Sequence, residues 1–284
     1  MSTSPEAPFP LGIIAGAGAM PFAVAESVRK QGRSAVLFAL RGICDPVRVA
    51  SYRHHWIAIG QVGRATRLFR QEGCRDLVFI GALTRPSLAQ IRLDLKTLRL
   101  FGTILQAFRG GDDHLLTGVG RILERDGFRL LGIRDVAPDL LMPEGCITQV
   151  VPGEAAAGDI EKGRAVLTAL GGFDIGQAVV VIDSHIVALE DIEGTDALLA
   201  RVARLRRQGR LRAPEGRGVL VKAVKSTQDL RFDLPTIGRK TVEGVAAAGL
   251  AGIAVVAGTT IVSEPQSMIV AADAKGLYIV GVAQ

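Results

Sequence analysis

The first half of the chain alternates short apolar runs with longer amphipathic segments, and this alternation limits what it can fold into. Leu11–Ala15 is an apolar run that ends in Gly-Ala-Gly, and Met20–Gln31 follows it with apolar residues at helical spacing. The same order continues with Ser34–Leu40, the helix-like Gly60–Glu72 and the apolar Leu77–Ile80. Because strands that alternate with helices form a parallel sheet, this half predicts a doubly wound, Rossmann-like α/β domain.

The second half of the chain mixes hairpins with helices and alternates less regularly. Ala178–Ile182 and His185–Leu189 are β-branched runs separated by Asp-Ser, which is a hairpin signal. Helix-like segments lie at Gly158–Gly171 and Asp196–Arg207, and Leu277–Val282 is a further strand candidate. These features predict a mixed α/β domain.

The length of the chain predicts two domains, because 284 residues exceed the common single-domain size. We place a disordered lead-in at residues 1–9, the N-terminal domain at 10–137 and the C-terminal domain at 138–284. We expect the active site in the cleft between the two domains. Within the first domain, Leu88–Arg109 is predicted to be helical, whereas His54 and His55 are placed in a polar loop.

Composition narrows the class of partner and the compartment. The net charge is +6, but aromatic residues make up only 5%, which argues against a nucleic-acid partner. We interpret the surplus of positive charge as a means of attracting anionic phosphate ligands or an anionic membrane surface. The alternative is a solvated basic surface that has no such partner. Cys44, Cys74 and Cys146 lack disulfide or zinc-site spacing, so we expect a cytoplasmic protein. The broken apolar run GLAGIAVVAGTTIVS is too short to span a bilayer.

A glycine loop follows the first predicted strand. Gly16, Ala17 and Gly18 form a candidate phosphate or sugar site, because glycines there let backbone N–H groups approach a phosphate at a helix N-terminus. The loop matches neither the P-loop nor the complete Gly-x-Gly-x-x-Gly pattern, so a bare tight turn is the alternative. Arg85, in the run GALTRP, is a candidate phosphate ligand because a guanidinium matches phosphate oxygens bidentately. An ordinary surface arginine is the alternative there.

Two acidic runs offer further candidates. Asp112 and Asp113 follow a Gly-Gly pair, and their alternative role is to cap a helix N-terminus. Glu193 and Asp196 belong to the run EDIEGTDALL, which holds four carboxylates in seven residues. Oxygen-rich clusters suit Mg²⁺, which one or two carboxylates hold together with substrate phosphates. Capping of the next helix by Thr195 or Asp196 is the alternative.

The most crowded polar stretch is VKAVKSTQDLRFDLPTIG, which runs from Val221 to Gly238. Its charged and amide members are Lys222, Lys225, Gln228, Asp229, Arg231 and Asp233. So many polar groups in one loop need solvent, one another or a ligand. Cations would neutralise a phosphate, and an aspartate would orient a water or hold a metal. A solvated charged loop without a ligand is the alternative.

Six of these motifs, taken together, resemble one family: the UDP-2,3-diacylglucosamine diphosphatases of the LpxI type, which act in lipid A biosynthesis. LGIIAGAGAMP, GALTRP, GGDD, DIGQAVVV, EGTDALL and RFDLPTIG occur in the family's order along nearly the whole chain. The resemblance implies hydrolysis of UDP-2,3-diacylglucosamine to UMP and 2,3-diacylglucosamine 1-phosphate (lipid X). It also implies a divalent metal, Mg²⁺ or another such as Mn²⁺, and a homodimer.

The resemblance further implies roles for particular residues. The family's essential aspartate lies in an Arg-x-Asp-Leu-Pro-Thr-Ile-Gly motif, which corresponds to Asp233 here, and Thr236 of the same motif is a candidate substrate ligand. We expect Asp233 to hold the metal or to position the attacking water, with Glu193 and Asp196 as further metal ligands. The C-terminal domain is then the catalytic one. The partner is a lipid-linked nucleotide sugar, met by peripheral contact with the inner membrane surface.

Two rival hypotheses come from other functional classes. The chain could be a nucleotide-sugar or phosphate-binding module without catalysis, which uses its glycine loop and basic loop only to hold phosphate. It could also be a Rossmann oxidoreductase, but the incomplete dinucleotide fingerprint disfavours that class. Release of UMP from a lipid-linked UDP-sugar separates the enzyme from the binding module.

Overall fold

The computed structural model describes residues 9–82, 94, 96–97, 112–173, 175–225, 229–232 and 234–283, and for residues 112–115 it describes the backbone alone. The chain divides into two compact units. Unit 1 comprises Met1–Leu140 and the separate segment Asp229–Asp233, whereas unit 2 comprises Leu141–Gln228 and Leu234–Gln284. The chain therefore leaves unit 1, returns to it for one short segment and then completes unit 2.

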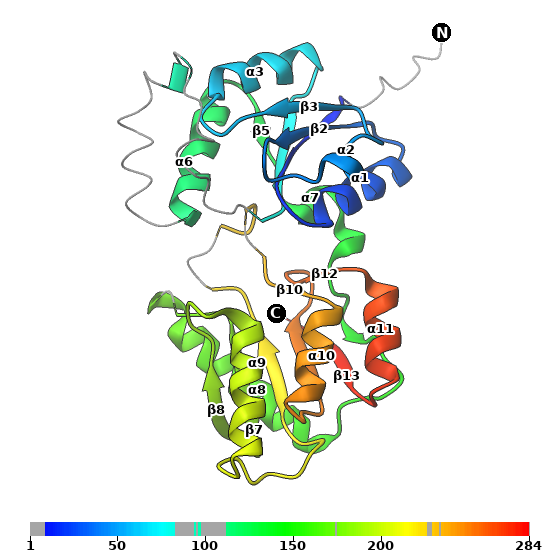
Figure 1. Cartoon of the computed structure of the whole chain (residues 1–284), viewed down its shortest axis with the longest axis vertical. Helices are drawn as coiled ribbons and strands as arrows, with labels where there is room; N and C mark the ends of the chain where they lie inside the picture. The colour runs from blue at the N-terminus through cyan, green and yellow to red at the C-terminus, as the bar shows by residue number, and fades with distance from the viewer. Residues whose placement is uncertain are drawn as a thin grey trace. The chain divides into compact units, whose positions relative to one another are not determined.

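Unit 1 is built on a five-stranded parallel sheet (Figure 1). Its strands are β1 (Leu11–Ala15), β2 (Ala35–Leu40), β3 (His54–Ile57), β4 (Asp76–Ile80) and β5 (Arg129–Leu130). They lie in the order β3-β2-β1-β4-β5, so the chain first runs outward from β1 to one edge and then returns to the other side of β1. Since central parallel strands are buried on both faces, they need continuous apolar runs such as LGIIA and AVLFAL.

Helices cover the two faces of this sheet. They are α1 (Met20–Lys30), α2 (Pro46–Val49), α3 (Val62–Gln71), α6 (Asp112–Arg125), α7 (Ile133–Val136) and the 3₁₀ turn η2 (Pro138–Leu140). On the face of α3 and α6, Phe69 packs edge-to-face against Phe38 and Phe128, with ring centroids 4.5 and 5.5 Å apart. On the other face, α1 packs against β1 and β2. The two apolar layers hold the carboxyl ends of the strands in place.

Unit 2 is built on a six-stranded mixed sheet with a small parallel pair beside it. The strands are β6 (Gly145–Cys146), β7 (Ala178–Ile182), β8 (His185–Leu189), β9 (Val219–Lys222), β10 (Thr236–Ile237), β11 (Gly252–Val256), β12 (Ile261–Val262) and β13 (Tyr278–Val282). The sheet order is β6-β13-β11-β9-β7-β8, in which β9, β11 and β13 are parallel, and β10 pairs with β12. The β7–β8 hairpin turns at Asp183 and Ser184, whose φ angles are +47° and +61°, as a primed turn requires.

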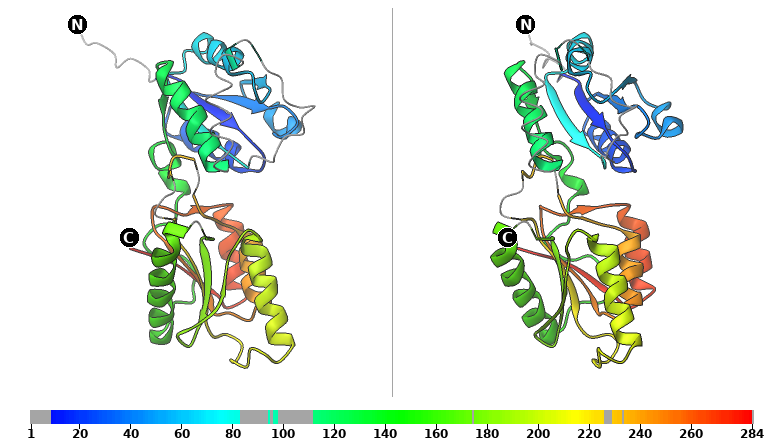
Figure 2. Two further views of the ribbon diagram at one scale, coloured as in Figure 1. Left: turned by 90° about the vertical axis from the view of Figure 1, so that its left-hand side faces the viewer. Right: turned by 60° about the vertical axis from the view of Figure 1, so that its left-hand side comes forward.

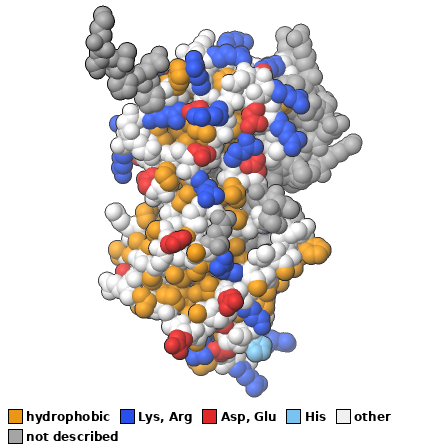
Figure 3. Space-filling model, turned by 180° about the vertical axis from the view of Figure 1, so that it is seen from behind, with side chains coloured by type: hydrophobic (Ala, Val, Ile, Leu, Met, Phe, Trp, Pro, Cys, Tyr) orange, Lys and Arg blue, Asp and Glu red, His pale blue; other side chains and the backbone are white. Residues whose placement is uncertain are grey.

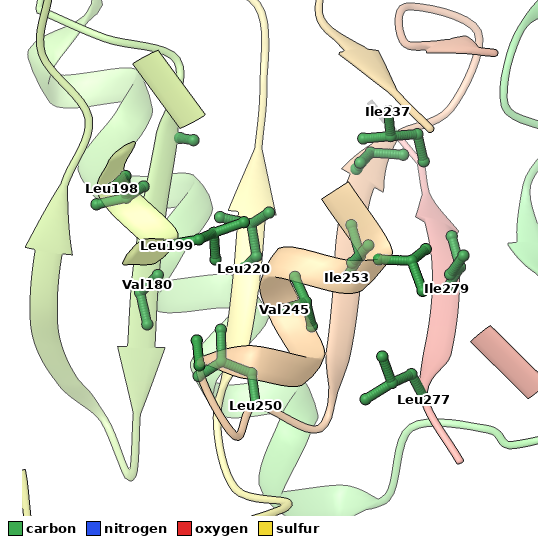
Figure 4. Packing of buried hydrophobic residues seen from close by; sticks show 14 of the residues in the cluster. Val180, Leu198, Leu199, Leu220, Ile237, Val245, Leu250, Ile253, Leu277 and Ile279 are labelled. Atoms are coloured by element: carbon green, nitrogen blue, oxygen red, sulfur yellow. The ribbon is translucent and has the colours of Figure 1, made fainter. Parts of the chain in front are cut away.

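Helices also cover both faces of the unit 2 sheet, as Figure 2 shows. They are α8 (Glu154–Leu170), α9 (Gly194–Arg207), α10 (Arg239–Ala247) and α11 (Pro265–Asp273), with a 3₁₀ turn η3 (Gly171–Phe173). Figure 4 shows the larger apolar layer, in which Leu199, Leu220 and Val245 meet between the sheet and the helices α9 and α10. Helix α8 covers the opposite face, where Ile160 and Leu167 pack on the sheet. Buried layers of this kind fix the strand ends that carry Lys222 and Glu190.

The predicted fold class is confirmed, because both units are α/β and unit 1 carries the parallel sheet. The predicted strand at Leu11–Ala15 and the hairpin strands match β1, β7 and β8 residue for residue. The placement of His54 and His55 in a loop is wrong, because both belong to β3. That strand lies at the sheet edge, where polar side chains find solvent. The helix predicted at Leu88–Arg109 lies outside the described residues.

The surface and the cysteines bear on the compartment and partner predictions. On the face drawn in Figure 3, Lys and Arg side chains over unit 1 are interspersed with acidic ones and form no continuous basic patch in the part of the chain described. Among the described helices, none is long and apolar enough to cross a membrane.

The three cysteines, Cys44, Cys74 and Cys146, are free, and burial raises the pKa of the Cys74 thiol to about 11. That thiol is therefore a poor nucleophile near neutral pH.

Candidate functional site

The glycine loop of unit 1 lies at the point where the strand order of the sheet reverses. Gly16–Gly18 follows β1, and Gly81–Ala82 follows β4, the neighbouring strand on the other side of the reversal. In open α/β sheets, ligands bind beyond the carboxyl ends of the strands at such a reversal. The fold therefore brings the glycine loop and the first two residues of the GALTRP motif, Gly81 and Ala82, to the edge where a ligand is expected.

Backbone hydrogen bonds tie these two loops together. Ala17 N–H donates to Ala82 O (2.9 Å), and Ala82 N–H donates to Ala17 O (3.1 Å). Glycine is required at both crossing points, because a Cβ on Gly16 would lie 2.7 Å from Ala82 O and one on Gly81 would lie 2.6 Å from Ala17 O. The motif glycines thus have a structural reason that does not involve a ligand.

The same bonds change which atoms of the glycine loop can hold a phosphate. Gly16 N–H already donates to Ile80 O (2.8 Å), and Ala17 N–H is used in the bridge. Over the described residues, no partner is found for the N–H groups of Gly18, Ala19 and Met20, which lead into α1. Ala19 provides no side-chain cap there. Because an uncapped helix N-terminus attracts anions, Gly18 rather than Gly16 or Ala17 is the member of the predicted site with an available donor.

In unit 2, the predicted residue Lys222 is a buried cation at the carboxyl end of β9. Lys222 is only 3% exposed to solvent. Lys222 Nζ donates to Thr195 Oγ1 (3.0 Å) on α9 and to Thr236 O (3.1 Å) on β10. The fold therefore gathers Lys222, Thr195 and Thr236, which lie far apart in the sequence, around one ammonium group.

A buried carboxylate completes this cluster. Thr195 Oγ1 donates to Glu190 Oε1 (2.9 Å), and Gln177 N–H donates to Glu190 Oε2 (3.0 Å). Glu190 is 6% exposed, and a Cβ on Gly176 would lie 2.2 Å from its backbone oxygen. A hydroxyl thus links a buried carboxylate to a buried ammonium, and such groups are kept inside a protein only when they are hydrogen-bonded or paired.

Glu190 belongs to the acidic run that the sequence offered as a candidate, but it was not among the metal or substrate ligands predicted there. Its only signal in the sequence is that it begins the acidic run directly after the strand His185–Leu189. We call Glu190, Thr195 and Lys222 the buried relay, because each hydrogen-bonds to the next. The buried relay explains residues of two sequence motifs. Gly176 and Gln177 of DIGQ contact Glu190, and Thr195 of EGTD is the middle member of the relay.

The two acidic residues predicted to hold a metal are each paired with a cation. Asp196 Oδ2 lies 2.6 Å from Lys240 Nζ, and Glu193 Oε1 lies 2.5 Å from Arg201 Nη2. Within the described ranges, no group of three or more His, Cys, Asp or Glu side chains that could hold a metal ion is found. The described residues thus do not supply a complete set of protein ligands, and the metal prediction depends on Asp233, which lies outside them.

The remaining predicted residues divide between the two units. Arg231 belongs to unit 1, where its guanidinium binds Asp229 and Glu124. The side chain of Thr236 is exposed, whereas Lys225 is half-buried in unit 2. Asp112 and Asp113 begin α6, which is the position that capping requires, but the structure describes only their backbone. Arg85, Gln228 and Asp233 lie outside the described residues.

Two surface hollows lie away from these residues. One, of about 410 Å³, is in unit 2 beside the residues that precede β9, β11 and β13, including Arg217, and beside Tyr278 at the start of β13. Lys222 ends β9, so this hollow is at the opposite edge of the sheet. The other, of about 520 Å³, lies along α3 beside Arg67 and Arg70. Of the predicted site residues whose side chains the structure describes, none lines either hollow.

Comparison with known proteins assigns both units. The family model described as LpxI N-terminal domain matches residues 10–140, and the one described as LpxI C-terminal domain matches residues 143–280. A curated relative from Caulobacter vibrioides is 39% identical over 272 residues, which cover 96% of this chain and 97% of the relative. That relative is named UDP-2,3-diacylglucosamine pyrophosphatase LpxI.

Proposed function

The chain belongs to the LpxI family, and from this we propose that it hydrolyses the pyrophosphate bond of UDP-2,3-diacylglucosamine to UMP and 2,3-diacylglucosamine 1-phosphate (lipid X). The observation that carries the proposal is the match to the named pyrophosphatase over 96% of the chain. A match to only one of the two units would not support the same reaction for the whole chain. Here both halves match, so the reaction is proposed for the whole chain.

Unit 1 supplies anion-binding groups for the nucleotide end of this substrate. The start of α1 presents the N–H groups of Gly18, Ala19 and Met20 beyond the carboxyl end of β1. Such a helix terminus carries a partial positive charge, which favours a diphosphate. The tied loops hold these donors in place before substrate arrives, so less ordering is required on binding.

Unit 2 supplies a preorganised cation. Because Lys222 is buried and oriented by Thr195 and by Thr236 O, its ammonium does not have to be ordered or desolvated when a phosphate approaches. An ammonium stabilises the extra negative charge that develops on phosphoryl oxygens during displacement. We therefore assign Lys222 to charge stabilisation and Thr195 to holding its orientation.

The proposed chemical step is in-line attack of water on the phosphorus next to the sugar. The water oxygen forms the new P–O bond, the bond from that phosphorus to the bridging oxygen breaks, and UMP leaves with the bridging oxygen. Asp233 is proposed to position the water or take up its proton. This assignment depends on the RFDLPTIG motif alone, because Asp233 lies outside the described residues.

We also propose dependence on Mg²⁺ or another divalent metal such as Mn²⁺. A bound divalent cation would supply charge neutralisation to the diphosphate, and Asp233 is the residue proposed to hold it. Asp196 and Glu193 remain weaker proposals, because their carboxylates are paired with Lys240 and Arg201.

Two properties of the assembly are proposed as well. We propose a homodimer, to be measured by light scattering of the purified protein during size exclusion. We also propose peripheral contact with the inner membrane surface, because the substrate carries two acyl chains. Co-sedimentation with anionic vesicles, compared with neutral ones, measures this contact.

The test of the reaction uses a matched pair of aspartate variants. The parent protein is incubated with UDP-2,3-diacylglucosamine and Mg²⁺, and UMP is quantified by chromatography. Asp233→Asn is expected to lower kcat by about 10²–10⁴-fold, the range of a general acid or base. Asp183→Asn, the same change at an exposed turn of unit 2, is expected to leave kcat unchanged. Binding of the UDP-sugar by the parent without UMP release would instead support the non-catalytic binding module.

A further inference from the structure

A short segment of the C-terminal half belongs structurally to unit 1. Asp229–Asp233 groups with unit 1, whereas Gln228 before it and Leu234 after it group with unit 2, and the structure describes its first four residues. We call Asp229–Phe232 the strap. Its position in the chain matters because Asp233, the proposed catalytic aspartate, follows Phe232 directly.

The strap is a tight turn with its own internal bonds. Phe232 N–H donates to Asp229 O (3.0 Å), and Arg231 N–H donates to Asp229 Oδ1 (3.0 Å). The Arg231 guanidinium donates to the same carboxylate through Nη2 (2.7 Å), and this bond holds the pKa of Asp229 below its usual range. The turn is therefore held in one conformation by its own side chains.

Two side chains of the strap anchor it to unit 1. Arg231 Nη1 donates to Glu124 Oε1 on α6 (2.7 Å). The Phe232 ring packs on Phe79 of β4, with centroids 5.5 Å apart. Gly120 of α6 makes room for that ring, because a Cβ there would lie 2.8 Å from Phe232 Cζ. The anchor is thus a ring seated on a glycine together with one ion pair.

The Phe232 ring lies at the rim of the unit 1 core. That core already contains Phe38, Phe69 and Phe128, which are at most 7% exposed, whereas Phe232 is only half-buried at its rim. A half-buried ring contributes less to stability than a fully buried one, because less apolar surface is removed from water. Its contacts with Phe79 and Gly120 do hold Phe232, the residue that precedes Asp233 in the sequence.

We infer that Phe232 and Arg231 are positioning residues, which fasten Asp233 to the unit that carries the glycine loop. The inference rests on the proposed function, because it gives the strap its purpose only if Asp233 acts in the reaction. It assigns Arg231 a role different from the direct phosphate ligand expected from the sequence. The role of Phe232 is to hold the segment, and the ring itself touches no reacting atom.

The experiment compares Phe232→Ala with Phe128→Leu, which trims a buried core ring whose edge-to-face partner is Phe69. In Phe232→Ala we expect faster hydrogen–deuterium exchange in the peptide spanning residues 229–234, and a modest fall in melting temperature, because the ring is half-buried. We also expect kcat to fall by about 10²-fold with KM changed much less, because small misplacements of a catalytic group cost that much. Phe128→Leu should lower the melting temperature and leave strap exchange and kcat as in the parent.

A ring-retaining variant completes the design. Phe232→Tyr should restore most of the kcat lost in Phe232→Ala. If strap exchange rises in Phe232→Ala while kcat stays within about threefold of the parent, the positioning role is wrong. If strap exchange does not rise, the anchor itself is wrong. A parent protein that releases no UMP would overturn the proposed function and this inference with it, and is thus distinguishable from failure of the strap alone.

Discussion

Replacing Thr195 by Val tests the buried relay, because it removes one hydroxyl and nearly preserves the shape of the side chain. The single hydroxyl proton goes to Glu190 Oε1, so the oxygen accepts from Lys222 Nζ. Thr195→Val therefore takes one hydrogen bond from a buried carboxylate and one from a buried ammonium. Each hydrogen bond to a charged group contributes about 1.5–3 kcal/mol, so we expect the free energy of unfolding to fall by roughly 3 kcal/mol or more.

The catalytic loss in Thr195→Val follows from the lost orientation of Lys222. If that orientation contributes about 1.4–2.7 kcal/mol of transition-state stabilisation, kcat/KM falls by roughly 10- to 100-fold. The matched control is Thr195→Ser, which keeps the hydroxyl and loses only a methyl group. Urea denaturation measures stability, and the initial rate of UMP release measures kcat/KM. Equal kcat/KM values for the Val and Ser variants would refute the relay.

Two further perturbations probe the rest of the account. Asp76 of unit 1 is paired with Arg33 (2.6 Å) and Arg129 (2.8 Å). Burial alone would raise the pKa of Asp76, but its two arginine partners outweigh burial and lower that pKa. The contribution of these ion pairs to stability is therefore present above about pH 4 and is lost as the pH falls below that. Asp76→Asn should therefore lower the free energy of unfolding by about 2 kcal/mol at pH 7, with the difference shrinking toward pH 3.5 in urea titrations, and a deficit independent of pH would contradict this assignment. Removal of divalent metal with EDTA should abolish UMP release and re-addition of Mg²⁺ should restore it, whereas full activity in EDTA would contradict metal dependence.

Local features of the sequence were enough to predict most of the strands. Leu11–Ala15 is a continuous apolar run, and a central parallel strand is buried on both faces, so pattern and environment agree. The Asp183-Ser184 turn likewise follows from residues that tolerate positive φ. By contrast, α11 was missed, because only Met268 and Ala272 of this helix are buried and its apolar pattern is weak.

The features missed in the candidate site depend on contacts between distant residues. Glu190 is one of four neighbouring carboxylates in the sequence, and only the fold shows that its side chain turns inward to Thr195 and Gln177. The strap was assigned to the C-terminal domain because its chain neighbours are there, yet the partner of Phe232 is Phe79 in unit 1. Gly16 and Ala17 were predicted to bind phosphate, but the bonds that occupy their N–H groups involve residues of another strand and loop.

Hydrolysis in ¹⁸O-labelled water tests the central claim most directly. The purified parent protein, UDP-2,3-diacylglucosamine and Mg²⁺ are incubated in labelled water, and both phosphate products are analysed by mass spectrometry. Attack of water on the phosphorus next to the sugar predicts UMP and 2,3-diacylglucosamine 1-phosphate in equal amounts, with one ¹⁸O in the sugar phosphate and none in UMP. Label in UMP would contradict attack at the phosphorus next to the sugar. Absence of both products would contradict the assignment of this chain as a UDP-2,3-diacylglucosamine pyrophosphatase.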